Sequence, residues 1–183
     1  MTNPYAIDAD TLSGMKPLRK VVYMLGSNLG DRLDNLQGAI DELAATPDVI
    51  IVDVSSVYET DAVGGPADNP AFLNAAVVAE TTLEPRTLLD RALAIEDAFD
   101  RVREEVNGPR TLDVDLLVVG NTVLDSPELT LPHPRAHERA FVLVPWAEID
   151  PDAEIPGRGP IKDLLAGLDR TGVTRSEQVL TAE

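Results

Sequence analysis

Four short stretches of the chain are almost continuously apolar, as expected for strands buried in a sheet. They cover residues 21–25, 49–57, 75–82 and 112–119, and the last contains six aliphatic residues. The first ends at Gly26-Ser27-Asn28, which favours a turn. Residues 61–70 carry two Gly, two Pro, two Asp and one Asn, so we expect a loop there.

Between these stretches the apolar residues recur at spacings of four and three, the period of an amphipathic helix. One stripe covers 29–43 and a second covers 88–102, after Pro85, which suits a first helical turn. Shorter helices are expected after Pro134 and over 161–168. The order strand, helix, strand, strand, helix, strand predicts an α+β, ferredoxin-like βαββαβ core, an antiparallel sheet with helices packed on one face, plus C-terminal additions.

The length and composition allow one domain with a substantial core. The chain has 183 residues, of which 44% are hydrophobic and 26% charged. Residues 1–19 show no period and contain two prolines, so we expect a mobile extension, then a single domain over 20–170 and a polar tail over 171–183. No apolar run approaches the roughly 20 residues of a membrane span, and the first residues lack the apolar stretch of a signal peptide. We therefore expect a cytoplasmic protein.

The charged residues suggest what the protein binds. A formal net charge of −17 opposes non-specific binding to nucleic acid or anionic membranes. However, five of the twelve arginines and both histidines lie within residues 101–139. Arginine suits phosphate groups, so this segment predicts a local site for a polyanion. Because the chain has no cysteine, disulfides, thiolate nucleophiles and zinc–thiolate sites are excluded, and a hard ion such as magnesium is the expected metal.

Asp113 and Asp115 lie at the start of the most apolar stretch, and a strand directs both carboxylates to one face. Such a pair could hold two magnesium ions about 4 Å apart. A solvated strand end is the alternative, because D-x-D triplets are common. Gly108-Pro109-Arg110 just upstream adds an arginine and favours a polyphosphate site. The chain has no Walker or Rossmann motif, and Gly26-Ser27-Asn28-Leu29-Gly30 could bind an anion but is more often a plain turn.

Four further residues suit a nucleotide and a flat ligand. His133 lies close in sequence to several arginines, where it could donate to phosphate, and a bound polyanion would favour its charged form. The rings of Phe72 and Phe141 with the amide of Asn74 would suit a heteroaromatic ligand. Packing of both rings in the core is an equal alternative.

Five segments form a specific combination. They are Gly26-Ser27-Asn28-Leu29-Gly30-Asp31-Arg32, Ser55-Ser56-Val57-Tyr58-Glu59-Thr60, Phe72-Leu73-Asn74-Ala75-Ala76, Gly108-Pro109-Arg110-Thr111-Leu112-Asp113-Val114-Asp115, and Leu131-Pro132-His133-Pro134 with Arg139-Ala140-Phe141-Val142-Leu143. Together they resemble the 6-hydroxymethyl-7,8-dihydropterin pyrophosphokinase family, whose members transfer the terminal diphosphate of ATP to a pterin alcohol in folate biosynthesis. The resemblance covers 21–150 and implies a ferredoxin-like fold, in agreement with the element order.

The resemblance also implies individual roles. Asp113 and Asp115 would hold two Mg²⁺ ions that bridge the ATP phosphates, and the pterin hydroxymethyl oxygen would attack the β-phosphorus in line, releasing AMP. Contacts with ATP are implied for Glu96, Arg101, Arg103, Arg110, His133 and Arg139. Of these, Arg101, Arg103 and Arg110 are implied to be catalytic together with the two aspartates. The pterin would be bound by Thr60, Val63, Phe72, Asn74 and Phe141.

The chain departs from the family in one place. The family usually has a basic residue and then an aromatic one immediately before Gly108, where this chain has Val106 and Asn107. We expect the polar stretch 103–107 to be mobile without ligands and to order when nucleotide and pterin are both bound.

Two other functions compete with this one. D-x-D also holds the metal of many nucleotide-sugar transferases, which usually need a larger nucleotide-binding domain. A ferredoxin-like RNA-binding module would need aromatic residues on the sheet and a basic face, whereas this chain has seven aromatic residues and a net charge of −17. We expect ATP and the pterin as partners, neither nucleic acid nor membrane, and a monomer.

Overall fold

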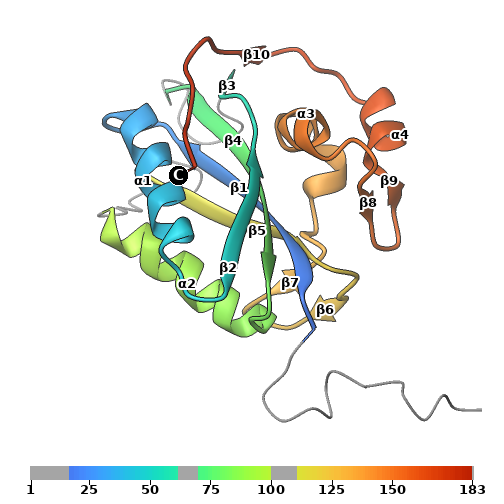
Figure 1. Ribbon diagram of the computed structural model, residues 1–183. Helices are drawn as coiled ribbons and strands as arrows, with labels where there is room; N and C mark the ends of the chain where they lie inside the picture. Colours follow the sequence, from blue (N-terminus) through green and yellow to red (C-terminus); the bar gives the residue numbers. More distant parts are fainter. Residues whose placement is uncertain (1–16, 62–69, 100–110, 183) are drawn as a thin grey trace, which may run out of the picture.

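The computed structural model describes residues 17–61, 70–99 and 111–182 (Figure 1). The core elements are β1 (Arg19–Ser27), α1 (Arg32–Ala44), β2 (Val49–Val54), β3 (Tyr58–Thr60), β4 (Phe72–Thr81), α2 (Pro85–Ala98) and β5 (Asp113–Val119). The chain continues with β6 (Leu124–Asp125), β7 (Thr130–Leu131), the 3-10 helix η1 (Ala136–Glu138), α3 (Ala140–Ile149), β8 (Glu154–Ile155), β9 (Gly159–Pro160), α4 (Ile161–Ala166) and β10 (Val173–Arg175). Within these ranges no helix is long and apolar enough to cross a membrane.

The main sheet has the predicted ferredoxin-like topology. Its strand order is β10-β3-β4-β1-β5, β2 also pairs with β4, and every pairing is antiparallel. The two long strands β1 and β4 lie at the centre, with Arg19 opposite Thr81 at one end and Ser27 opposite Leu73 at the other. The predicted βαββαβ fold is therefore confirmed. The strand expected over 75–82 begins three residues earlier, at Phe72.

The strand expected over 49–57 ends earlier, at Val54, and a separate strand, β3, begins at Tyr58. The strands β2 and β3 pair with different parts of β4. Ser55 lies at the break. Its backbone N–H donates to the carbonyl of Ala76 at 2.9 Å, and its hydroxyl accepts from the amide of Ala76 at 2.8 Å. The hydroxyl thus replaces a backbone acceptor where the strand is interrupted.

Alternate residues of β1 enter two separate cores, because successive side chains of a strand point to opposite faces. Val21, Tyr23 and Leu25 pack with residues of α1 and α2, whereas Val22 and Met24 pack with residues of α3 and α4. Figure 1 shows the two pairs of helices on opposite sides of the sheet. The helices of the βαββαβ core, α1 and α2, therefore share one face as expected, and the C-terminal additions α3 and α4 cover the other. The segment after β5 covers the second face, and its strongly apolar helix α3 buries Trp146 completely.

The C-terminal segment, expected as a polar tail, is tied to the body of the domain. Its strand β10 pairs with β3. Leu180 is 9% exposed and joins the core that contains α1. The side chain of Gln37 on α1 makes two hydrogen bonds with the backbone of Thr181, of 2.7 and 3.0 Å. We call residues 169–182 the C-terminal strap.

Candidate active site

A row of facing residues crosses three strands at one end of the main sheet. Gly26 of β1 lies opposite Asn74 of β4 on one side and opposite Asp113 of β5 on the other. Residues directly opposite each other in antiparallel strands point to the same face. Asp115 shares that face and lies opposite Met24, which packs in the core beneath α3. The α3 face of the sheet therefore brings together the aspartate pair and the predicted pterin-binding asparagine.

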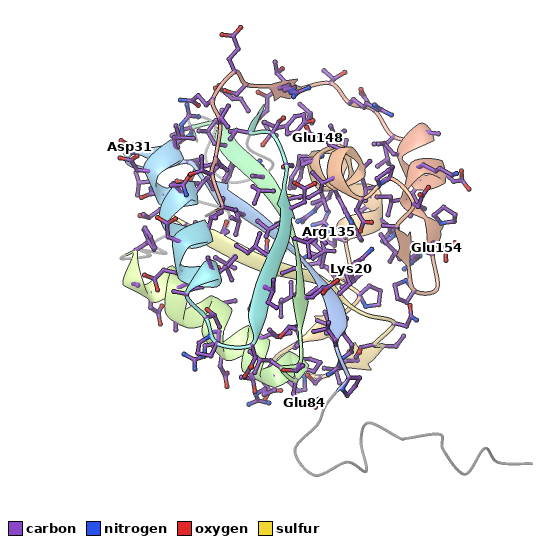
Figure 2. All side chains as sticks on the ribbon, viewed as in Figure 1. Lys20, Asp31, Glu84, Arg135, Glu148 and Glu154 are labelled. Carbon is purple, nitrogen blue, oxygen red and sulfur yellow. The ribbon has the colours of Figure 1, made fainter. Side chains whose placement is uncertain are left out.

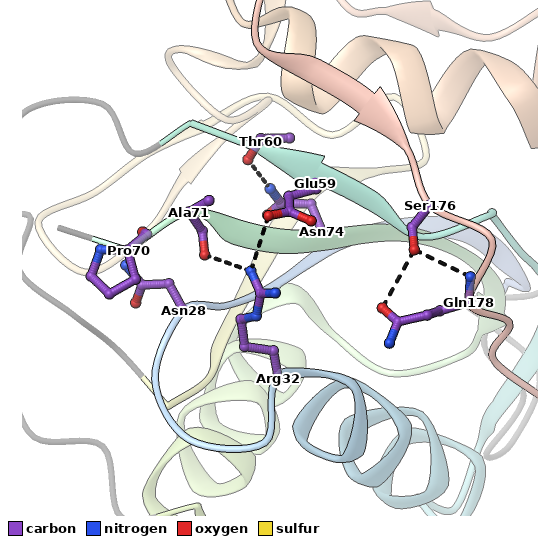
Figure 3. Close-up of polar contacts among 9 residues, drawn as sticks. All are labelled: Asn28, Arg32, Glu59, Thr60, Pro70, Ala71, Asn74, Ser176 and Gln178. Atoms are coloured by element: carbon purple, nitrogen blue, oxygen red, sulfur yellow. Dashed lines mark hydrogen bonds and ion pairs between the residues drawn. The ribbon is translucent and has the colours of Figure 1, made fainter.

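Asn74 is buried and held by a neighbouring strand. Its Nδ2 donates to the hydroxyl of Thr60 at 2.5 Å (Figure 3). A Cβ atom on Gly26 would lie 2.8 Å from Asn74 Oδ1 and 3.4 Å from Cδ1 of Phe72. Glycine is required here because a larger residue would displace the amide. Phe72 and Asn74 share a face because they are two residues apart within β4.

The segment from Gly26 to Arg32 positions the start of β4. Asn28 Nδ2 donates to the carbonyl of Pro70 at 2.9 Å, and Arg32 Nη1 donates to the carbonyl of Ala71 at 3.0 Å (Figure 3). These contacts hold the backbone immediately before Phe72. Of the two roles open for this motif, they support the structural turn.

The carboxylates of Asp113 and Asp115 are half-buried and exposed respectively, at the start of β5. In the described part of the chain, no group of three or more acidic or histidine side chains could hold a metal by itself. Two carboxylates nevertheless fit magnesium, which commonly takes one or two protein carboxylates and completes its octahedral shell with phosphate oxygens and water.

The positive charge of Arg139 lies near Asp115. Burial and the nearby charge of Arg135 lower the pKa of Arg139, whereas Asp115 and Glu138 oppose that shift. Its guanidinium carbon lies 5.5 Å from the centre of the Phe141 ring, a cation–π contact. Arg139 is therefore close enough to serve both the aspartate end and the aromatic end of the site.

A cleft of about 470 Å³ opens beside these residues. Thr60 from the end of β3 and Arg139 and Phe141 from the start of α3 line it, together with residues of η1 and of the C-terminal strap. Its size is in the range of small-molecule sites. Three residues predicted to bind substrates thus share one cleft, although they come from separate parts of the chain.

His133 lies along the outer edge of β5. Its backbone N–H donates to the carbonyl of Leu117 at 2.8 Å, and its Nδ1 accepts from the backbone N–H of Arg135 at 3.2 Å. Burial, and then the charges of Arg139 and Arg135, lower the pKa of His133 to about 4. The imidazole is therefore neutral at pH 7, and with Nδ1 accepting a hydrogen bond, Nε2 carries the proton.

Glu96 lies on α2 and is 3% exposed. Its Oε2 accepts from the backbone N–H of Val114, between the two aspartates, at 2.9 Å. The carboxylate thus fixes the strand that carries Asp113 and Asp115. This contact gives Glu96 a positioning role next to the predicted nucleotide site.

Four predicted site residues lie outside the described residues: Val63, Arg101, Arg103 and Arg110. The stretch 103–107, with its unusual Val106 and Asn107, also lies outside them. Their roles remain predictions from the sequence.

One contact that the sequence did not indicate anchors α3 to the sheet. Glu148 accepts from the hydroxyl of Tyr58 at 2.6 Å and from the backbone N–H of Ser56 at 2.7 Å. Figure 2 shows Glu148 on α3, on the same side of the sheet as Arg135. Tyr58 and Glu148 are 90 residues apart, so no local pattern could have paired them.

The sequence of residues 22–151 matches the model of the family described as 7,8-dihydro-6-hydroxymethylpterin-pyrophosphokinase (HPPK). The chain belongs to this family. A 2-amino-4-hydroxy-6-hydroxymethyldihydropteridine pyrophosphokinase of Methylorubrum extorquens is 46% identical over 153 residues, covering 84% of this chain and 96% of the relative. The enzyme of the same name from Pseudomonas aeruginosa is 40% identical over 158 residues, covering 86% and 97%.

The fold is similar to that of a solved HPPK structure. A crystal structure of Plasmodium falciparum HPPK-DHPS with pterin and p-hydroxybenzoate matches with a TM-score of 0.64 and 15% identity over 87% of this chain. The chain spans 44% of that longer protein, and at this identity the match shows the fold alone.

Membership of the HPPK family makes the chain a pyrophosphokinase, as the segment resemblance implied. It also decides against the nucleotide-sugar transferase and the RNA-binding module, because neither activity belongs to this family.

Proposed function

We propose that this HPPK transfers the β,γ-diphosphate of ATP to the hydroxymethyl group of 6-hydroxymethyl-7,8-dihydropterin and releases AMP, as a step of folate biosynthesis. The observation that carries the proposal is the arrangement on the α3 face of the sheet. Asp113 lies in one row with Gly26 and Asn74, and Asp115 lies on the same face two residues along β5, so the proposed phosphate-binding and ring-binding ends are continuous. The names of the most similar relatives support the same chemistry.

Asp113 and Asp115 would hold magnesium, for which two ions are proposed with ATP. Bound magnesium would neutralise charge on the phosphates during transfer. The carboxylates lie on the strand that Glu96 fixes through the amide of Val114. Placing both ligands on one rigid strand favours a defined metal geometry.

Cationic and neutral donors would orient the phosphates. Arg139 is near Asp115 and lines the cleft, so it can bind phosphate beside the metal ligands. His133 offers Nε2–H as a donor, and a bound polyanion would raise its lowered pKa toward the charged form. Arg101, Arg103 and Arg110 are proposed to add further phosphate contacts, on the strength of the family resemblance.

The pterin would bind at the other end of the row. Phe72 and Phe141 would stack on its ring, and the buried amide of Asn74, oriented by Thr60, would recognise its hydrogen-bonding edge. The hydroxymethyl oxygen would then attack the β-phosphorus while the bond from that phosphorus to the bridging α-phosphate oxygen breaks, and AMP leaves. Such a transfer depends on positioning and charge neutralisation more than on a strong protein base.

The test is to mix the protein with ATP, magnesium and hydroxymethyldihydropterin and to separate the products by chromatography. We expect AMP and a pterin diphosphate. ADP with a pterin monophosphate would refute diphosphate transfer.

Variants of the aspartate pair connect this activity to the site. Asp113→Ala or Asp115→Ala should remove most turnover, because each removes a proposed metal ligand, while the apolar face of β5 is unchanged. Thermal unfolding of each variant provides the control for folding. Full activity of either variant at low magnesium concentration would contradict the assignment.

A further inference from the structure

The C-terminal strap supplies one wall of the cleft in which the pterin is proposed to bind. Four of its residues, Asp169, Thr171, Gly172 and Val173, line the cleft. The match to the HPPK family model ends at residue 151, before the strap begins. The family match therefore assigns no role to this wall, and its role has to be inferred from its contacts.

Strand pairing fixes the position of Val173. It lies opposite Thr60 of β3, which lies opposite Phe72 of β4. Since opposite residues share a face, Val173 points to the same side of the sheet as Phe72 and Asn74. The strap thus extends the proposed pterin-binding surface by one strand. Val173 is half-buried, as expected for an apolar residue at the edge of an open cleft.

The turn before β10 is held by its own hydrogen bonds and lies close against Asp61. Asp169 Oδ1 accepts from the backbone N–H of Thr171 at 2.8 Å and from its hydroxyl at 2.6 Å. Gly172 has a φ of 83°, and its carbonyl accepts from the N–H of Asp61 at 3.1 Å. A Cβ atom on Gly172 would lie 2.6 Å from Oδ2 of Asp61. Both the backbone conformation and the available space therefore require glycine.

We propose that the C-terminal strap is part of the pterin-binding site and that Val173 contacts the pterin ring. The inference rests on the proposed function, since it assigns the ligand of the same cleft. The isopropyl group of Val173 would remove ring surface from water at the side of the cleft away from β4. It would contribute to pterin affinity without touching the phosphates, which bind near β5.

The decisive comparison is between two neighbouring residues of β10. Val173→Ala shortens the proposed contact, whereas Thr174→Ala, the matched control, changes an exposed residue that lies opposite Glu59 and faces the other way. We expect Val173→Ala to raise the KM for hydroxymethyldihydropterin about fivefold, from the loss of two partly buried methyl groups. In Val173→Ala, the KM for ATP and kcat should each change by less than about twofold. Val173→Ile keeps an apolar branched side chain and should keep the pterin affinity of the wild type. Thr174→Ala should match the wild type in all three constants.

Titration calorimetry of the pterin, with α,β-methylene-ATP present, gives a readout that does not depend on turnover. Weaker binding by Val173→Ala alone would support the proposal. Equal binding by both variants and the wild type, or equal losses of pterin and ATP affinity in Val173→Ala, would overturn it. A wild-type protein that binds the pterin but releases no AMP would refute the proposed reaction only, because the calorimetric comparison would still decide the role of the strap.

Discussion

The protonation of His133 depends on burial and on the positive charges beside it. Burial and the neighbouring guanidinium groups lower its pKa from 6.5 to about 4. Between these two values the unfolded chain binds a proton that the folded protein does not bind. The free energy of unfolding therefore falls as pH decreases from 6.5 toward 4, and this loss is absent above 6.5.

We predict that His133→Asn reduces this loss. At pH 5 the loss attributable to His133 should be about 1 kcal/mol after allowance for screening by solvent. Between pH 7 and pH 5, the free energy of unfolding should therefore fall by that much more in the wild type than in His133→Asn. Denaturant unfolding at both pH values measures the difference, and carboxylates that titrate in both proteins cancel. Identical pH dependence in the two proteins would show that the imidazole is charged or exposed in the folded state.

The ring of Phe72 is proposed to stack on the pterin, and a variant can test this role. Phe72→Ala should weaken binding of the pterin by about tenfold while ATP affinity stays within about twofold, because a stacked ring contributes about 1 kcal/mol beyond its buried area. Calorimetry with each ligand separately measures both affinities. Equal losses for the two ligands would favour a role for the ring in core packing.

The helix α3 carries Phe141 and follows directly on Arg139, so its position on the sheet sets the geometry of the cleft. Its contact with the sheet is partly polar, through Glu148, Tyr58 and the amide of Ser56. Burial raises the pKa of the Tyr58 hydroxyl to about 12, and the carboxylate that accepts its hydrogen bond adds to that shift. Although burial alone favours protonation of Glu148, these hydrogen bonds lower its pKa below the ordinary 4.5.

We predict that Glu148→Gln lowers the free energy of unfolding by about 1 kcal/mol or less at pH 7, since the carboxylate is partly open to solvent. A group with a lowered folded-state pKa stabilises the fold above its unfolded value. The difference between wild type and variant should therefore be constant above about pH 5 and shrink as pH falls below 4.5. Urea unfolding at pH 7 and pH 4 tests this. A difference that does not change with pH would mean that the charge of Glu148 is not involved.

The C-terminal strap packs on the body of the domain, although it comes from the last residues of the sequence. The C-terminal strap pairs with β3, and its last residues contact α1. Leu180 is 9% exposed, whereas its neighbour Val179 is 75% exposed. The two residues therefore offer a matched pair for testing whether the strap contributes to the stability of the whole molecule.

Leu180→Ala should lower the free energy of unfolding by about 2 kcal/mol, the lower end of the range for buried leucines, because the segment is close to the chain end. Val179→Ala should have an effect close to zero, since an exposed side chain gains little by burial. Thermal or denaturant unfolding measures both. Equal effects of the two variants would show that the strap does not stay on the core in solution.

The local pattern of the chain was enough to predict the order of the core elements. The spacing of apolar residues predicted α1 and α2, and the apolar runs predicted β1, β4 and β5, because both patterns depend only on neighbours in sequence. The combination of five short segments, of which the D-x-D pair is one part, was enough to indicate the family. The break at Ser55 was not predictable in the same way, since it depends on the amide of Ala76 on another strand.

The sequence predicted candidate residues for the site, but it did not predict how the fold brings them together. Spacing predicts that Asp113 and Asp115 share a face, but only the register of β1 with two neighbours places Gly26 between Asn74 and Asp113. The contact of Tyr58 with Glu148 and the position of Val173 beside Thr60 likewise join distant residues. Period-two and period-3.6 patterns define faces within one element, whereas distances between elements follow from long-range pairing and packing, which no local pattern records.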